Sequence, residues 1–163
     1  GDYFNSEIIK NVREELKLDI GEPTAEEIKI SIGTAIPHGE RLEISVRGRD
    51  VTTGLPRETI IKDTQVRAWL NRPLKAIIES IKDLIEITPP ELAGDVSKNG
   101  IYVCGGGSML RGIDQLIQKE IGVKVRVVEE PLACVVRGTG MVIEKLNEHS
   151  HLLNNFSNTN LTN

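Results

Sequence analysis

Three consecutive glycines and a serine, Gly105, Gly106, Gly107 and Ser108, are the residues of this sequence best suited to chemistry. They separate an apolar run at residues 101–104, which predicts a short strand, from an amphipathic segment that predicts a helix. Because glycine has no Cβ, such a turn can approach a ligand closely, and amides at the start of the helix can donate to a phosphate. The spacing matches neither a Walker A loop nor a dinucleotide fingerprint, so a ligand loop and a plain strand-to-helix turn both stay open.

Glu26 and Lys29 form a second candidate pair. They are three positions apart and therefore share one face of a helix. Thr24 and Glu27 have the spacing of a capping box, which predicts that this helix begins at Thr24. The pair could contact a ligand if another part of the protein faced it, whereas a solvated ion pair would contribute only about 0.2–0.5 kcal/mol.

None of the other reactive side chains is predicted to be catalytic. His38, His149 and His151 show no metal-ligand spacing, which favours surface roles. Cys104 ends the predicted strand and is expected to be a small buried apolar residue rather than a nucleophile. No arrangement resembles a Ser/His/Asp triad.

The first elements follow from the spacing of apolar residues. A helix is predicted over residues 2–17, with Asp2 as its N-cap, and the next helix is expected to end at Gly33. Alternation of apolar and polar residues at 42–46 and 58–62 predicts a hairpin.

A long helix is predicted after the hairpin. Asp63 or Thr64 is expected to cap it, and prolines and a threonine at 88–90 are expected to stop it. Pro73 lies inside this pattern and predicts a kink or a restart.

The last third alternates strands with helices, which is typical of an α/β lobe with a parallel or mixed sheet. A helix at 109–117, a strand at 123–128 and a helix at 132–146 are predicted after the glycines. Gly138 and Gly140 in the last helix are expected to allow close packing on the sheet.

Four segments describe the predicted organisation. An α/β lobe is built from residues 1–20 and 96–148, and residues 21–95 form an insertion of a hairpin and helices. Residues 149–163 are mostly Asn, Ser and Thr and are expected to be a disordered tail.

Composition excludes several classes of protein. The 163 residues carry a net charge of −4, with 39% hydrophobic, 27% charged and 3% aromatic residues, which predicts a globular protein without a broad nucleic-acid surface. No apolar run approaches the ~18–20 residues of a membrane span, so neither membrane insertion nor secretion is expected. Cys104 and Cys134 are too few for a disulfide framework and fit a reducing cytosol.

Residues 103–112 resemble the adenosine motif of the actin/heat-shock-70/sugar-kinase ATPase superfamily. Five further segments resemble the MreB family of bacterial actin-like, rod shape-determining proteins, namely residues 1–2, 21–26, 88–92, 129–132 and 137–140. The resemblance runs to about residue 148 and covers only the second half of that family's pattern. It therefore implies an α/β fold, the second lobe of the actin-like (ribonuclease H-like) ATPase fold, in which the lobe is subdomain IIA and the insertion is subdomain IIB.

The resemblance also implies a site and a cofactor. Family members hold ATP and Mg between two lobes, so Glu26 and Lys29 would close over the adenine and ribose. The turn at Gly105–Ser108 would lie against the ribose and α-phosphate. The family usually has an Asp where this chain has Asn5, which puts a charge-dependent role there in doubt.

Function and partners are implied in the same way. The resemblance implies a cytoplasmic cytoskeletal protein, at the inner face of the membrane, that assembles head to tail into filaments and works with cell-shape or cell-wall synthesis proteins. Because the resemblance covers only the second half of the family's pattern, both phosphate loops and the first lobe are expected to be missing, which would explain the start at Gly1 rather than Met. The chain should therefore not hydrolyse ATP alone. Two alternatives are a nucleotide-free module that docks a separate partner lobe and another ATPase of the superfamily.

Overall fold

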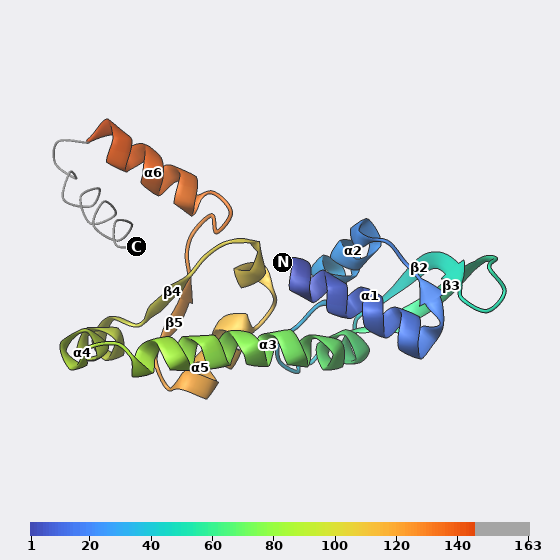
Figure 1. Cartoon of the computed structure of the whole chain (residues 1–163), viewed down its shortest axis with the longest axis horizontal. Helices are drawn as coiled ribbons and strands as arrows, with labels where there is room; N and C mark the ends of the chain where they lie inside the picture. The colour runs from blue at the N-terminus through green and yellow to red at the C-terminus, as the bar shows by residue number, and fades with distance from the viewer. Residues whose placement is uncertain (146–163) are drawn as a thin grey trace, which may run out of the picture.

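The computed structural model describes residues 1–145, which form six α-helices and two small sheets. In chain order the elements are α1 (Asp2–Leu16), β1 (Leu18–Asp19), α2 (Glu22–Ile32), β2 (Glu43–Asp50), β3 (Pro56–Lys62), α3 (Asp63–Glu86), α4 (Pro90–Asn99), β4 (Ile101–Val103), the 3₁₀ turn η1 (Gly106–Met109), α5 (Ile113–Ile121), β5 (Val125–Val127) and α6 (Cys134–Glu144). In Figure 1 the long helix α3 runs between α1, α2 and the hairpin near one end and α4 near the other, and α6 stands apart. The 149–163 tail, with His149 and His151, lies outside the described residues.

The apolar stripes of α1, α2 and α3 meet in one core beside the hairpin. Each helix carries apolar residues at helical spacing, so that one face is buried and the other is solvated. The buried members are Phe4, Ile8 and Val12 of α1, Ala25, Ile28 and Ile32 of α2, and Val66, Trp69, Leu70 and Leu74 of α3. This core fixes α2, and therefore the face with Glu26 and Lys29, against α1.

The predicted hairpin is confirmed and is longer than expected. β2 and β3 pair antiparallel from Glu43 opposite Lys62 to Arg49 opposite Pro56. The sequence pattern missed β1, a two-residue strand that adds to the free edge of β2 with Leu18 opposite Asp50. The sheet order is β1-β2-β3.

The helix α3 runs unbroken from Asp63 to Glu86, so the restart expected at Pro73 does not occur. Pro73 is fully buried, and its ring packs in the core. The predicted helix stop near residue 88 is confirmed, but the α4 that follows was missed. Its first helical residue is Pro90, where the absent N–H costs no hydrogen bond.

Three expected helix caps are wrong by one or more residues. Gly1, not Asp2, is the N-cap of α1, and α2 begins at Glu22, so Thr24 caps nothing. Pro23 explains the earlier start of α2, because proline is tolerated in the first turn. At α3 the N-cap is Lys62, whose backbone amide donates to Gln65 Oε1 at 3.1 Å.

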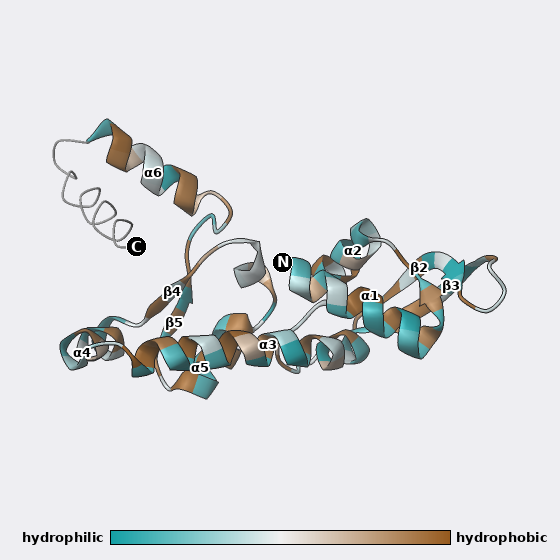
Figure 2. Ribbon diagram, viewed as in Figure 1, coloured by the Kyte–Doolittle hydropathy of each residue, from teal (hydrophilic) through white to brown (hydrophobic). Residues whose placement is uncertain are grey.

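The last third contains a parallel pair of strands, as predicted. Ile101 of β4 lies opposite Val125 of β5, and α5 packs its Ile113 and Ile117 into the core beside them. The helix α6 stands apart in Figure 1 and has no buried residue, although parts of its ribbon have the brown of hydrophobic residues in Figure 2. A Cβ at Gly138 or Gly140 would meet nothing within 4 Å, so the expected close packing of α6 is wrong for the described residues.

Candidate functional site

The glycine turn leaves the end of β4 in a conformation that needs glycine. Gly105 has a φ of +81°, a region that side chains strongly disfavour. Its amide donates to the Pro131 carbonyl at 2.8 Å, and its carbonyl accepts the Ser108 hydroxyl at 2.7 Å. Ser108 is 5% exposed, so its side chain closes the turn from within.

The helix that was expected directly after the glycines is a short 3₁₀ turn instead. Residues Gly106–Met109 form η1, and α5 begins only at Ile113. Gly112 precedes α5 with a φ of +74°, and a Cβ there would lie 2.4 Å from Ile36. The glycine turn therefore does not lie at the N-terminus of a long helix, and no such helix dipole adds positive charge there.

Two amides of the turn are free for a ligand. In residues 1–145, the amides of Gly106 and Gly107 have no hydrogen-bond acceptor, whereas the Ser108 and Leu110 amides donate to Gly105 and Gly107 carbonyls. A Cβ at Gly105 would meet nothing within 4 Å, so the surface above it is open. Adjacent free amides on an open glycine turn can donate to phosphate or ribose oxygens.

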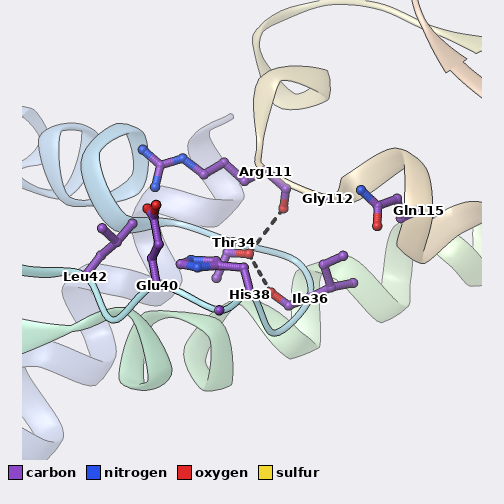
Figure 3. Close-up of a pocket in the computed structure, with 9 residues that line it drawn as sticks. Thr34, Ile36, His38, Glu40, Leu42, Arg111, Gly112 and Gln115 are labelled. Atoms are coloured by element: carbon purple, nitrogen blue, oxygen red, sulfur yellow. Dashed lines mark hydrogen bonds between the residues drawn. The ribbon is translucent and has the colours of Figure 1, made fainter.

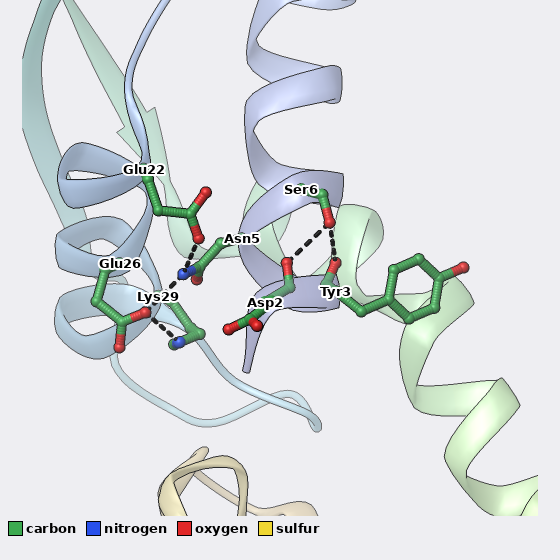
Figure 4. A network of polar contacts seen from close by, with 7 residues as sticks. All are labelled: Asp2, Tyr3, Asn5, Ser6, Glu22, Glu26 and Lys29. Atoms are coloured by element: carbon green, nitrogen blue, oxygen red, sulfur yellow. Dashed lines mark hydrogen bonds and ion pairs between the residues drawn. The ribbon is translucent and has the colours of Figure 1, made fainter.

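Glu26 and Lys29 share one face of α2, as predicted, and are bonded to each other. Lys29 Nζ donates to Glu26 Oε2 at 2.6 Å (Figure 4). Asn5 Nδ2 of α1 donates to the same oxygen at 2.7 Å and to Glu22 Oε1 at 2.8 Å. The bonds from Lys29 and then Asn5 hold the pKa of Glu26 below its ordinary value, so the carboxylate stays charged.

Asn5 was noted in the sequence only as a departure from the family's Asp, and its place in this cluster was not predicted. It is 3% exposed, and its Oδ1 has no hydrogen-bond partner in the part of the chain that the structure describes. A polar residue between Phe4 and Ile8, on the buried side of α1, was the available signal. A buried amide that bonds two carboxylates fixes their positions relative to α1.

The end of α2 packs against the segment that follows the glycine turn. A Cβ at Gly33 would lie 3.0 Å from Leu110 Cδ1, and Thr34 forms a parallel bridge with Arg111. The Gly33 amide donates to the Lys29 carbonyl at 3.0 Å, and the Leu110 amide to the Gly107 carbonyl at 3.3 Å. Lys29 and Gly107 are thus each one turn away from the same contact.

The first turn of α1 lies between the two groups of candidate residues. A Cβ at Gly107 would be 3.9 Å from Phe4 Cε2, and the next residue, Asn5, bonds to Glu26. In Figure 1 the N-terminus accordingly lies beside α2 and near the turn after β4. The predicted site residues are therefore parts of one region of the molecule.

A pocket of about 530 Å³ lies elsewhere, beside the Thr34–Arg111 bridge (Figure 3). It is lined by Thr34, Ile36, His38, Gly39, Glu40, Leu42, Arg111, Gly112 and Gln115, none of which is a predicted site residue. The His38 side chain, which was expected to have a surface role, is 25% exposed, and its Nε2 lies 3.9 Å from Asp63 Oδ2.

Cys104 is exposed, which overturns its expected burial. The chain turns outward at Gly105 directly after it, so the end of β4 faces solvent. Among residues 1–145, no group of three or more His, Cys, Asp or Glu side chains could hold a metal ion. No helix of the described residues is long and apolar enough to cross a membrane.

Solved structures share this fold. MreB 5 of Spiroplasma citri bound to AMPPNP superposes with a TM-score of 0.87 at 33% identity, over 92% of this chain and 45% of that one. The MamK double helical filament matches at 22% identity with a TM-score of 0.65, over 80% of this chain and 40% of that one. The fold and the glycine turn after β4 define an α/β protein of the actin-like ATPase fold.

Sequence comparison gives the family. The MreB/Mbl protein family model matches residues 1–151. The cell shape-determining protein Mbl of Bacillus subtilis is 41% identical over 91% of this chain and 44% of its own length. The cell shape-determining protein MreB of Escherichia coli is 42% identical over 91% of this chain and 43% of its own length. The chain belongs to the MreB/Mbl family and spans less than half the length of these curated relatives.

Proposed function

We propose that this chain is the adenosine-side part of a bacterial actin-like cytoskeletal protein that binds ATP, assembles into filaments and helps to determine cell shape. The names of its relatives support the cell-shape role. Nucleotide binding is supported by MreB 5 of Spiroplasma citri, which was solved with AMPPNP and with ADP and is 33% and 34% identical to this chain. The observation that carries the proposal is the open glycine turn, with its two free amides, beside the Glu26–Lys29 pair.

Each candidate residue has a distinct part in the proposed site. The amides of Gly106 and Gly107 would donate to the ribose and α-phosphate, and the left-handed Gly105 would keep the approach open. Ser108 acts indirectly, because its hydroxyl is already bonded to the Gly105 carbonyl. Glu26 and Lys29 would face the adenine and ribose, with the Lys29 ammonium held in place by the carboxylate. The nucleotide itself would supply the phosphate bond that the complete protein hydrolyses.

The proposal places hydrolysis and Mg binding outside the described residues. No group of His, Cys, Asp or Glu side chains within residues 1–145 fits a metal site made by the protein alone. A cleft site needs preorganised groups on both walls, and this chain offers the adenosine wall. We therefore expect weak nucleotide binding and no measurable phosphate release from the 163-residue chain.

Docking of a partner lobe is the second proposed role, and a specific observation favours it. Large apolar side chains are exposed on β4, η1, β5, α6 and the turn before α6, namely Tyr102, Met109, Val127, Leu132, Val135, Val136, Met141 and Ile143. Large exposed apolar side chains on neighbouring segments are the composition expected of an interaction surface. The division into subdomains IIA and IIB, the head-to-tail filament and a cytoplasmic location at the membrane's inner face belong to the same proposal.

Amide chemical-shift mapping of the 163-residue chain tests the nucleotide site. Titration with ADP should shift the amides of Gly106 and Gly107, which would donate to the ligand, and that of Lys29, whose side-chain ammonium would face it. Gly106→Val should abolish these shifts, since a branched side chain would fill the turn near Leu132, where a Cβ already has a contact at 3.5 Å.

Gly138→Val is the matched control, because Gly138 has open space around it and lies on α6. It should bind ADP like the unchanged chain. Shifts confined to residues outside the glycine turn and α2, or no shifts at millimolar ADP, would contradict the proposed site.

A further inference from the structure

The two cysteines of the chain meet at the start of α6. The Cys104 thiol, directly after β4, lies close enough to the thiol of Cys134, the first residue of α6, for that neighbour to raise its pKa. Two backbone features bring them there: the Gly105 amide donates to the Pro131 carbonyl at 2.8 Å, and Cys134 Sγ lies 3.5 Å from the same carbonyl. A single carbonyl therefore anchors the neighbour of one cysteine and the side chain of the other.

The two cysteines differ in their exposure to solvent. Cys104 is exposed, whereas Cys134 is half-buried. An oxidant therefore reaches Cys104 first, and Cys134 lies within reach of the product. Contact with Cys134 raises the pKa of the Cys104 thiol, which keeps it protonated at neutral pH and makes the first step slow rather than absent.

We propose that Cys104 and Cys134 are a site of reversible disulfide formation that ties the end of β4 to the start of α6. The proposal does not depend on nucleotide binding. With a low-molecular-weight disulfide as the oxidant, the Cys104 thiolate attacks one sulfur and releases one thiol, leaving a mixed disulfide on Cys104. The Cys134 thiolate then attacks the Cys104 sulfur and releases the second thiol. The two cysteines lose two electrons and two protons, and the oxidant gains both.

The bond would close a loop of about 30 residues that contains the glycine turn and α5. In the reduced chain α6 has no buried residue, so few contacts hold it to the rest of the molecule. Leu132, two residues before Cys134, packs 3.5 Å from the Cβ position of Gly106. Oxidation would thus hold the turn before α6 against the glycine turn.

Equilibration of the 163-residue chain in glutathione and glutathione disulfide tests the proposal. The products are analysed by intact mass and by alkylation of free thiols, both in native buffer and in urea. We expect the native chain to lose both thiols and the mass of two hydrogens while staying monomeric on a non-reducing gel. The equilibrium constant should be at least tenfold larger in native buffer than in urea, because folding brings the thiols together.

Cys104→Ser, at an exposed position, and Cys134→Ser, at a half-buried one, are the matched variants. Each should end as a single glutathione adduct, since no second thiol can displace the glutathione. A native chain that keeps both thiols, carries glutathione adducts or forms linked dimers would overturn the proposal. Equal equilibrium constants in native buffer and urea would overturn it as well.

Discussion

Leu110 packs directly against Gly33, with its Cδ1 atom 3.0 Å from where a Cβ would stand. This contact joins the end of α2 to the segment that leaves the glycine turn. Lys29 lies one turn before it on α2, and Gly107 lies one turn before it on η1. The relative position of the two proposed ligand-binding segments is therefore set by a residue without a side chain.

Gly33→Ala should destabilise the protein by about 1–3 kcal/mol, because the new methyl group would overlap the Lys29 carbonyl oxygen at 2.2 Å and crowd Leu110. Urea unfolding followed by circular dichroism measures the loss. Gly39→Ala is the control, since a Cβ at Gly39 meets nothing within 4 Å. Equal unfolding midpoints for the two variants would contradict the packing described for Gly33.

Gly105→Ala should cost about 1–3 kcal/mol for a different reason, since the space around Gly105 is open but its backbone conformation is not one that alanine adopts readily. Thermal unfolding measures the change. Gly138→Ala should instead stabilise α6 by up to about 1 kcal/mol, because alanine is the better helix former and no atom opposes it. A neutral Gly105→Ala would show that the left-handed turn is not needed.

Asn5→Ala should destabilise the protein by about 1–3 kcal/mol, because the buried amide is the donor that lies between the Glu22 and Glu26 carboxylates. Asn11→Ala is the comparison, since Asn11 donates only to the Glu7 carbonyl of its own helix. The urea concentration at the midpoint of unfolding should be lower for Asn5→Ala than for Asn11→Ala. The reverse order would remove Asn5 from the supporting role given to it here.

Glu26→Gln should lower stability at neutral pH by no more than about 0.5 kcal/mol, because the carboxylate is 44% exposed and solvent weakens its ion pair. The bonds from Lys29 and Asn5 lower the pKa of Glu26 from its ordinary 4.5. Its contribution is therefore complete above pH 4.5 and disappears as the pH falls through the lowered value.

The difference in free energy of unfolding between the Glu26→Gln variant and the unchanged chain, called the gap below, should thus disappear in strong acid. Urea unfolding at pH 7 and at pH 3 measures that gap, and other carboxylates cancel in the difference. Glu27→Gln, at an exposed position of the same helix, should show no gap at either pH. A gap for Glu26→Gln that persists unchanged in acid would contradict the assigned cause.

Periodic patterns predicted the elements well because they report which face is buried. The alternation around Ile44 and Ile60 predicted the hairpin, and the spacing from Val66 to Ile85 predicted α3. The strand before Gly105 was predicted for the same reason. Residue types at the ends of helices were less informative, since Thr24 has a capping pattern although Pro23 already lies inside the helix.

Properties that depend on distant parts of the chain could not be predicted. The exposure of Cys104 depends on where the chain turns after β4, and its contact with Cys134 depends on the Gly105–Pro131 hydrogen bond. Asn5 bonds Glu26 across 21 positions of sequence. The local sequence does not predict contacts between residues so far apart, whereas the shared face of Glu26 and Lys29 follows from helix geometry alone.

Within residues 1–145, the sheet that carries the glycine turn has two strands of three residues each. Such a pair is marginal in water unless other elements support it, and here α5 supplies the support through Ile113 and Ile117. Amide hydrogens of β4 should therefore exchange with solvent much faster than those of α1 and α3. Part of any ligand's binding free energy would then be spent on ordering the turn, so affinity and local folding are one coupled equilibrium.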